Sequence, residues 1–147
     1  MKHIAAYALA FLISTASFAQ QNNAPKPTLF QNYADIINCS EAELARAINF
    51  TQGQSVTVAF DNNFSFSGIV TSNTVVDNTI QSIIIKSPLL NNTILQISKR
   101  NYSNGNAVYI GRIINQNYFD GYELKKNAAG NYQLTKIETD KVIQPCH

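Results

Sequence analysis

The residue types that most often carry catalysis are scarce in this chain of 147 residues. It has two histidines, one of them in an N-terminal segment that we expect to be removed, which leaves His147. A Ser-His-Asp or Cys-His arrangement needs an imidazole held about 3 Å from its nucleophile by a third group. The last residue of this sequence is a poor candidate for such placement, so we expect no histidine-dependent catalysis.

The first nineteen residues have the layout of a secretory signal peptide. Lys2 supplies the positive charge, and residues 4–16 form an apolar run. Ser17 and Ala19 then place small side chains at positions −3 and −1 of a cut before Gln20. The apolar run is too short for a comfortable transmembrane helix, which needs about 20 residues, and no later stretch approaches that length. We therefore expect a secreted or periplasmic protein with no membrane span.

The two cysteines, Cys39 and Cys146, both lie after the signal peptide. Export implies an oxidising compartment, so a disulfide between them is expected. The alternatives are two free thiols or an intermolecular disulfide. Closing a loop of about 100 residues would stabilise the fold by roughly 4–5 kcal/mol in the chain-entropy model. The bond would fasten the C-terminal tail to the start of the domain and leave no thiolate for catalysis or for a metal site.

Carboxylate chemistry is harder to exclude. The sequence contains no G-x-S-x-G elbow, G-x-G-x-x-G loop or P-loop. A glycosidase, however, needs only two carboxyl groups about 5–10 Å apart, one of them with a raised pKa. Candidates are Asp61, Asp77 and Asp120 in predicted turns and Glu123 on an outward strand position. Aspartate commonly bonds backbone in turns, so we expect structural roles, no metal and no cofactor.

Composition limits the partners. The formal net charge of the whole chain is only +2, which gives no electrostatic reason to expect nucleic acid or an anionic membrane. The mature chain of about 130 residues has the size of one domain. Its richness in Asn, Ile, Ser and Thr favours short strands with turn-rich connections.

The pattern changes from helical to strand-like along the chain. Residues 20–28 are polar and hold two prolines, which predicts an extended leader before a domain over 29–147. Apolar residues within 29–37 fit one helical face. A second helix is predicted after Ser40, which forms a capping box with Glu43, and it ends before Gly53.

Beyond Gly53 the apolar residues alternate with period two, and Asn104-Gly105 predicts a hairpin turn. The fold class that follows is mainly β (α+β): an antiparallel meander or small barrel of about seven strands, with one or two N-terminal helices packed against it. The predicted strands are 55–60, 64–70, 80–87, 93–100, 107–114, 121–126 and 131–137.

Two regions could contact a partner. The leader, with Pro25, Pro27 and Leu29, could lie along a cleft by strand addition. Tyr118 and Phe119 lie in an aromatic loop, where such residues are common interface anchors, although Phe119 could instead enter the core.

A basic patch is a third possibility. Lys99, Arg100 and Arg112 lie on the strands that flank the predicted Asn104-Gly105 turn and could converge. The alternative is that they are ordinary strand charges that block aggregation.

These features favour a non-enzymatic exported binding protein, most concretely an inhibitor of an exported hydrolase or protease. The alternatives are a small-ligand carrier barrel, which would need an internal cavity above about 300 Å³, and a carboxylate-based hydrolase. The layout is similar to small exported antiparallel folds such as OB-type barrels and cystatin-like sheets, and such scaffolds host inhibitors, carriers and adhesion modules. The oligomeric state is left open.

Overall fold

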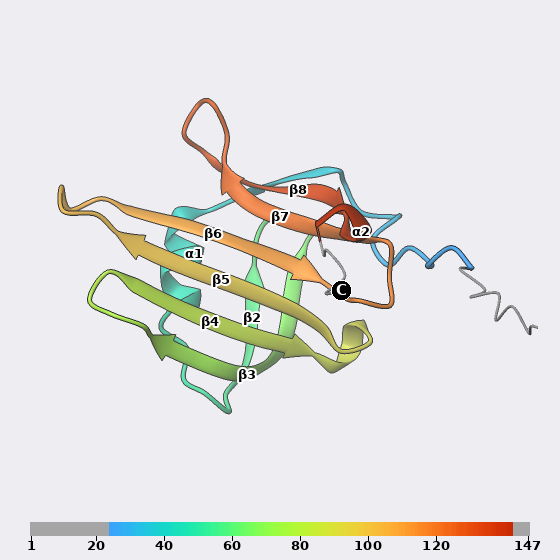
Figure 1. Ribbon diagram of the computed structural model, residues 1–147, viewed down its shortest axis with the longest axis horizontal. Helices are drawn as coiled ribbons and strands as arrows, with labels where there is room; N and C mark the ends of the chain where they lie inside the picture. The colour runs from blue at the N-terminus through green and yellow to red at the C-terminus, as the bar shows by residue number, and fades with distance from the viewer. Residues whose placement is uncertain (1–23, 143–147) are drawn as a thin grey trace, which may run out of the picture.

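The period-two pattern after Gly53 produces one antiparallel sheet in the computed structural model, which describes residues 24–142 (Figure 1). The elements are β1 (Ile36–Cys39), α1 (Glu41–Ala47), β2 (Ser55–Ala59), β3 (Ser65–Val75), β4 (Ile80–Ser87), the 3-10 turn η1 (Pro88–Leu90), β5 (Thr93–Asn101), β6 (Ala107–Ile114), β7 (Asp120–Lys126), β8 (Tyr132–Glu138) and α2 (Thr139–Val142).

The sheet has the strand order β1-β8-β7-β6-β5-β4-β3-β2. Strands β2 to β8 follow one another as a meander, and β1 pairs with β8 at the far side. Consecutive strands β1 and β2 therefore form opposite edges of the sheet. Figure 1 shows the sheet curled, with α1 on one side of it and α2 on the other. The mainly β antiparallel prediction is confirmed.

Three glycines, Gly68, Gly111 and Gly121, lie where neighbouring backbones approach closely. A Cβ atom added to Gly68 would lie 2.5 Å from the carbonyl oxygen of Lys86, and one added to Gly111 would lie 2.3 Å from that of Gln96. No real side chain tolerates such distances, so these positions need glycine. Glycine within a strand commonly marks a sharp bend or a close backbone approach, and both positions help the sheet to curl.

The core lies between the inner face of the sheet and α1. Alternate side chains of the predicted strands are buried, and β4 is an interior strand of the sheet, with Ile83 and Ile85 fully buried. The correctly predicted core residues are Val56, Val58, Phe60, Phe64, Phe66, Val70, Leu95, Ile97, Tyr122, Leu124, Tyr132 and Leu134.

The predicted helix over residues 29–37 is wrong. Tyr33 donates to the carbonyl of Phe30 (3.0 Å) in a single turn, and the chain then becomes β1, with Ile37 opposite Leu134. A helical face would have buried Tyr33, which is 41% exposed. Pairing with the edge of β8 outweighs the short helical pattern, and it raises the strand count from about seven to eight.

The second predicted helix is confirmed as α1, but its capping box is not. Ser40 occupies the N-cap position without forming a side-chain cap bond. Glu43 turns away from the helix start and accepts a hydrogen bond from the backbone N–H of Ala59 in β2 (2.9 Å). Its carboxylate also accepts from Arg46 Nε (2.9 Å).

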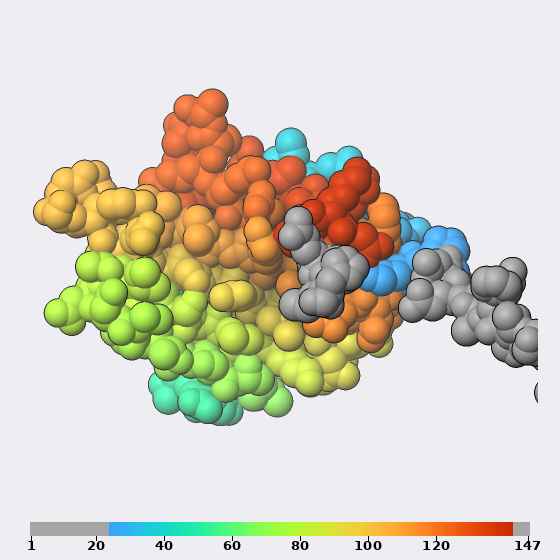
Figure 2. Space-filling view, in the orientation of Figure 1, coloured from blue at the N-terminus to red at the C-terminus, as the bar shows by residue number. Residues whose placement is uncertain are grey.

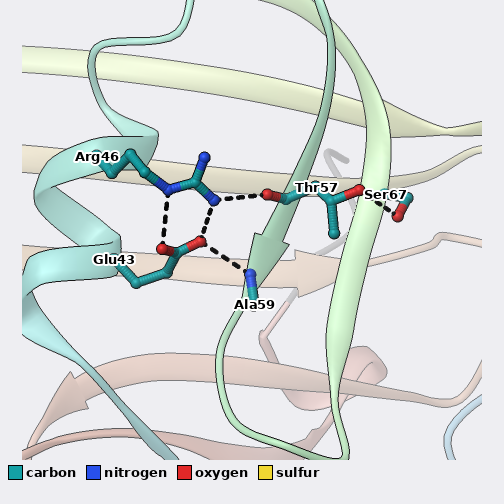
Figure 3. A network of polar contacts seen from close by, with 5 residues as sticks. All are labelled: Glu43, Arg46, Thr57, Ala59 and Ser67. Carbon is teal, nitrogen blue, oxygen red and sulfur yellow. Dashed lines mark hydrogen bonds and ion pairs between the residues drawn. The ribbon is translucent and has the colours of Figure 1, made fainter.

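Through these contacts α1 covers the outer edge of β2 (Figure 3). Arg46 Nη2 donates to the carbonyl oxygen of Thr57 (2.8 Å), while Glu43 binds the N–H of Ala59. Both backbone groups point away from β3. The hydrogen bonds to β3 alternate along β2, and the bonds of Gln54 and Phe60 assign them to the even-numbered residues. One ion pair thus satisfies two backbone groups of an edge strand.

We expect Glu43→Ala to lower the free energy of unfolding by about 1–2 kcal/mol, because it leaves the Ala59 N–H without its acceptor and releases Arg46. Hydrogen bonding from Arg46 holds the pKa of Glu43 below its ordinary value of 4.5. The contribution is therefore present above pH 4.5 and is lost as the pH falls through the lower folded value. Urea unfolding of the variant and of Glu41→Ala, in the same helix turn, tests this; equal losses in both would contradict it.

Candidate functional site: an apolar groove beside the N-terminal segment

A buried carboxylate holds the N-terminal segment against the sheet. Asp120, the first residue of β7, is 5% exposed and accepts hydrogen bonds from the backbone N–H groups of Leu29 (2.5 Å) and Phe30 (2.8 Å). Next to it, the N–H of Phe119 donates to the carbonyl oxygen of Pro27 (2.9 Å). A carboxylate that accepts two backbone bonds fixes chain direction, so residues 27–30 are positioned before any partner arrives.

An aromatic cluster anchors the same segment. The ring of Phe30 packs edge-on against Tyr122 (5.2 Å between centroids) and Phe64 (6.2 Å). The Tyr122 hydroxyl donates to the carbonyl oxygen of Ala34 (2.7 Å). Burial raises the pKa of Tyr122 to about 12, so this donor stays protonated in neutral solution. The cluster joins the N-terminal segment to β7 and to the β2–β3 turn.

A groove of about 680 Å³ lies between this segment, the end of β8 and α2. In Figure 2 the N-terminal segment (blue) and α2 (dark red) lie close together on the same face. The apolar lining of the groove comes from four separate parts of the chain: Ile36, Phe119, Ile137 and Val142. Ile36 is 56% exposed, which is unusual for an isoleucine and leaves apolar surface available to a partner.

Charged side chains of both signs form the rim of the groove. Lys136 Nζ lies 2.8 Å from a carboxylate oxygen of Asp35, and Lys141 Nζ lies 2.7 Å from one of Glu138. Because each lysine is paired, the rim carries little net charge. An apolar floor with paired charges suits a peptide segment better than a small anion.

The open edge of β1 adjoins the groove. Lys136 donates its N–H to the carbonyl of Asp35 (2.8 Å), so residues 35, 37 and 39 direct their backbone groups toward β8. Backbone groups alternate in direction along a strand, so those of Ile36 and Asn38 point away from the sheet. Unlike β2, whose edge α1 covers, β1 presents these groups at an uncovered edge within the described residues.

The structure brings together the two predicted partner-binding regions. Phe119 lines the groove, and Pro25 and Pro27 are exposed in the segment that leads to it. Leu29 packs against the core. Tyr118 is half-buried, and its hydroxyl accepts a hydrogen bond from Asn91 Nδ2 (2.7 Å) at the base of the β4–β5 connection.

The three basic residues are not brought together. Lys99 pairs with Tyr109 on the inward-facing row, whereas Arg100 and Arg112 lie on the outer face. Arg100 pairs with Val108 and Arg112 with Gln96, which places the two arginines four residues apart along the ladder, about 13 Å.

The four candidate carboxylates have separate structural contacts. Asp61 caps its own turn through Asn63 and Phe64, and Asp120 lies buried at the start of β7 rather than in the predicted turn. Hydrogen bonding from Thr79 lowers the pKa of Asp77, and that from Lys125 lowers the pKa of Glu123. Lowered values oppose the protonated form that a general acid needs at neutral pH.

Cys39 is half-buried at the end of β1, and burial raises the pKa of its thiol to about 11. Its predicted disulfide partner Cys146 lies outside the described residues, as does His147. Among residues 24–142, no three His, Cys, Asp or Glu side chains lie close enough to hold a metal ion. No helix in this part of the chain is long and apolar enough to cross a membrane.

The interior of the curled sheet is filled by side chains of the sheet and of α1. Besides the groove, two smaller hollows of about 510 and 340 Å³ lie at the surface, one over β6 and β7 and one beside η1. Comparison of the chain with models of protein families, with curated proteins and with solved structures gave no significant match.

The sequence analysis named Asp120 without foreseeing its role, and it did not name Ile137. Asp120 is predicted to lie in a turn, and nothing local shows that its partner Phe30 lies 90 residues earlier. Ile137 did give a signal: it is an apolar residue on an outward position of an otherwise alternating strand. Such an exception can mark a surface that another segment covers.

We expect Asp120→Ala to lower the free energy of unfolding by about 2–3 kcal/mol, since it leaves two backbone N–H groups without acceptors in a buried site. The segment before Phe30 should also become protease-sensitive. Asp140→Ala is the matched control, because Asp140 pairs with Lys26 at the exposed surface and should change stability by less than about 0.5 kcal/mol. Thermal melting and limited proteolysis measure both; an intact segment in Asp120→Ala would contradict the role given to Asp120.

Tyr122→Phe removes the bond to Ala34 and should cost about 1 kcal/mol at pH 8. The folded pKa of about 12 exceeds the ordinary value of 10.0, so this residue's contribution is complete below pH 10 and is lost as the pH rises toward 12. The difference in urea midpoint between wild type and variant should therefore shrink between about pH 8 and pH 11. A constant difference would show that the hydroxyl titrates normally in the folded protein.

Proposed function

We propose that this chain is a secreted or periplasmic, non-enzymatic binding protein, and that it recognises an extended segment of an exported protein partner in the groove. The observation that carries the proposal is the exposed apolar floor of that groove, with Ile36, Phe119 and Ile137 contributed by separate elements. Inhibition of an exported hydrolase or protease is its most concrete form.

The groove has a suitable volume for such a segment, and one of its walls is already ordered. Its volume of about 680 Å³ falls within the range that holds ligands of several side chains. Asp120 and the aromatic cluster already order the N-terminal wall, so binding would cost little conformational entropy there. Apolar side chains of the partner would contact the floor, while its polar groups would meet the charged rim.

The two alternatives have less support. A carrier barrel holds its ligand inside, whereas core side chains fill this interior and the groove lies on the outside. A carboxylate-based hydrolase needs two converging carboxyl groups, one with a raised pKa. In the groove, Asp35 and Glu138 each pair with a lysine instead.

Export also favours the Cys39–Cys146 disulfide, which we retain as a proposal. In an oxidising compartment it would join the end of β1 to the C-terminal residues. The test is to unfold the protein without reductant, alkylate it and measure its mass. A disulfide between the two cysteines leaves no thiol to alkylate.

The groove is tested by one substitution inside it and a matched one outside. Ile36→Lys introduces charge into the floor, and Ile110→Lys changes an isoleucine of nearly equal exposure (57%) on β6, away from the groove. A partner captured from culture medium or periplasm with the wild-type protein should bind Ile36→Lys about 10–100-fold more weakly and Ile110→Lys normally. Equal affinity for wild type and Ile36→Lys, or equal losses in both variants, would refute the groove as the binding site.

A further inference from the structure

We propose that the hollow over β6 and β7 is a second pocket of the same binding surface, and that Arg112 in it binds an acidic side chain of the partner. The partner is then an extended segment with an apolar side chain in the groove and a carboxylate about four residues away in the hollow. This inference rests on the proposed function, to which it adds the charge and the spacing of the recognised segment.

The hollow adjoins the groove through the register of the sheet. One row of residues crosses β1, β8, β7 and β6, because each member is paired with the next: Ile36, Thr135, Glu123 and Arg112. Directly paired residues have their side chains on the same face of a sheet. The first two residues of the row line the groove, and the last two line the hollow. The two recesses are therefore neighbours on one face.

The row also sets the distance between the two recesses. Three strand intervals separate Ile36 from Arg112, which is about 14 Å at about 4.8 Å for each interval. An extended chain advances about 3.3 Å per residue, so residues four apart in a partner are separated by about 13 Å. A segment that crosses the strands therefore places one side chain against Ile36 and another beside Arg112.

The lining of the hollow contains two cations and one carboxylate. Arg112, Lys125 and Glu123 line it together with uncharged residues such as Gln96 and Ser98. Lys125 Nζ lies 2.9 Å from one carboxylate oxygen of Glu123, whereas Arg112 Nη2 lies 3.7 Å from the other. The lysine therefore binds Glu123 closely and the arginine contacts it only loosely. One positive charge in the hollow is left without a matching carboxylate in its lining.

Arg112 is well suited to bind a second carboxylate. Its side chain is 46% exposed, and its contact with Glu123 is longer than a hydrogen bond. A guanidinium group presents two parallel N–H donors that match the two oxygens of a carboxylate. Lys125, which is 58% exposed on the neighbouring strand, adds to the attraction for a negative charge. The hollow thus favours an aspartate or glutamate over a neutral or basic side chain.

The first test is selection from a displayed library of random linear peptides of about 12 residues, long enough to reach both recesses. The full chain without its predicted signal peptide should enrich peptides with Asp or Glu about four residues from an apolar residue. Arg112→Glu should instead enrich Lys or Arg at the acidic position, because the charge of the pocket is reversed. The matched control is Lys86→Glu, an exposed position on β4 outside the hollow, which should enrich the same acidic peptides as wild type.

The second test measures the affinity of one enriched synthetic peptide by fluorescence anisotropy. Arg112→Gln should weaken binding about fivefold, as expected for a partly exposed ion pair, and Lys86→Gln should change it by less than about twofold. Glu123→Gln should strengthen binding about fivefold, because it removes the carboxylate that competes for both cations. A peptide with its acidic residue changed to the amide should bind wild type and Arg112→Gln equally. Thermal melting reports whether each variant is folded.

The outcomes separate this inference from the proposed function. Enriched peptides that need Ile36, as shown by weak binding to Ile36→Lys, but that have no acidic preference would overturn the acidic pocket and leave the groove in place. Peptides that bind wild type and Arg112→Gln equally, or that bind folded Glu123→Gln more weakly than wild type, would also overturn the pocket alone. Failure to enrich any peptide, or equal binding to Ile36→Lys and wild type, would overturn the groove and the pocket together.

Discussion

A sheet that curls without closing has two edges, and the backbone groups at those edges need partners. This constraint organises the whole molecule. At β2 the partners are the side chains of Glu43 and Arg46, delivered by the helix that connects the two edge strands. At β1 the outward groups of Ile36 and Asn38 lie next to the groove. The two edges thus differ in their backbone partners, and the proposed binding groove lies beside β1, whose edge is uncovered within the described residues.

The N-terminal segment is held by long-range contacts of two kinds. Asp120 binds two of its backbone amides, and the aromatic rings around Phe30 bury its one large core side chain. Together they place residues 27–35 beside β7 and β8, and without them β1 would have no fixed position from which to pair. A surface that is ordered in advance can bind with less entropic cost than a loose tail, which connects this packing to the proposed binding role.

The groove and the proposed Cys39–Cys146 disulfide concern neighbouring parts of the molecule but are separate proposals. The groove lies on the outer face, where Ile137 and Phe119 provide apolar surface. Ile36 of β1 lines the groove, and the proposed disulfide would fasten the other end of that strand. A disulfide at Cys39 would then stabilise the binding surface rather than the centre of the core.

The sequence by itself determined the meander. Apolar and polar residues alternate in segments such as 55–60 and 93–100, and this alternation indicates which side chains face the core. It can be found from sequence because it depends only on neighbouring residues. The sequence also predicted the helix α1 and, separately, the aromatic loop of Tyr118 and Phe119. The tertiary structure alone decided the rest. Residues 36–39 form a strand, in place of the end of the expected helix, because the edge of β8 supplies partners about 100 residues away. Asp120 leaves its expected turn role because its partners lie 90 residues earlier. Glu43 leaves its capping box because the edge of β2 competes for it. In each case a long-range hydrogen-bonding partner overrode a local preference, and no local pattern encodes such a partner.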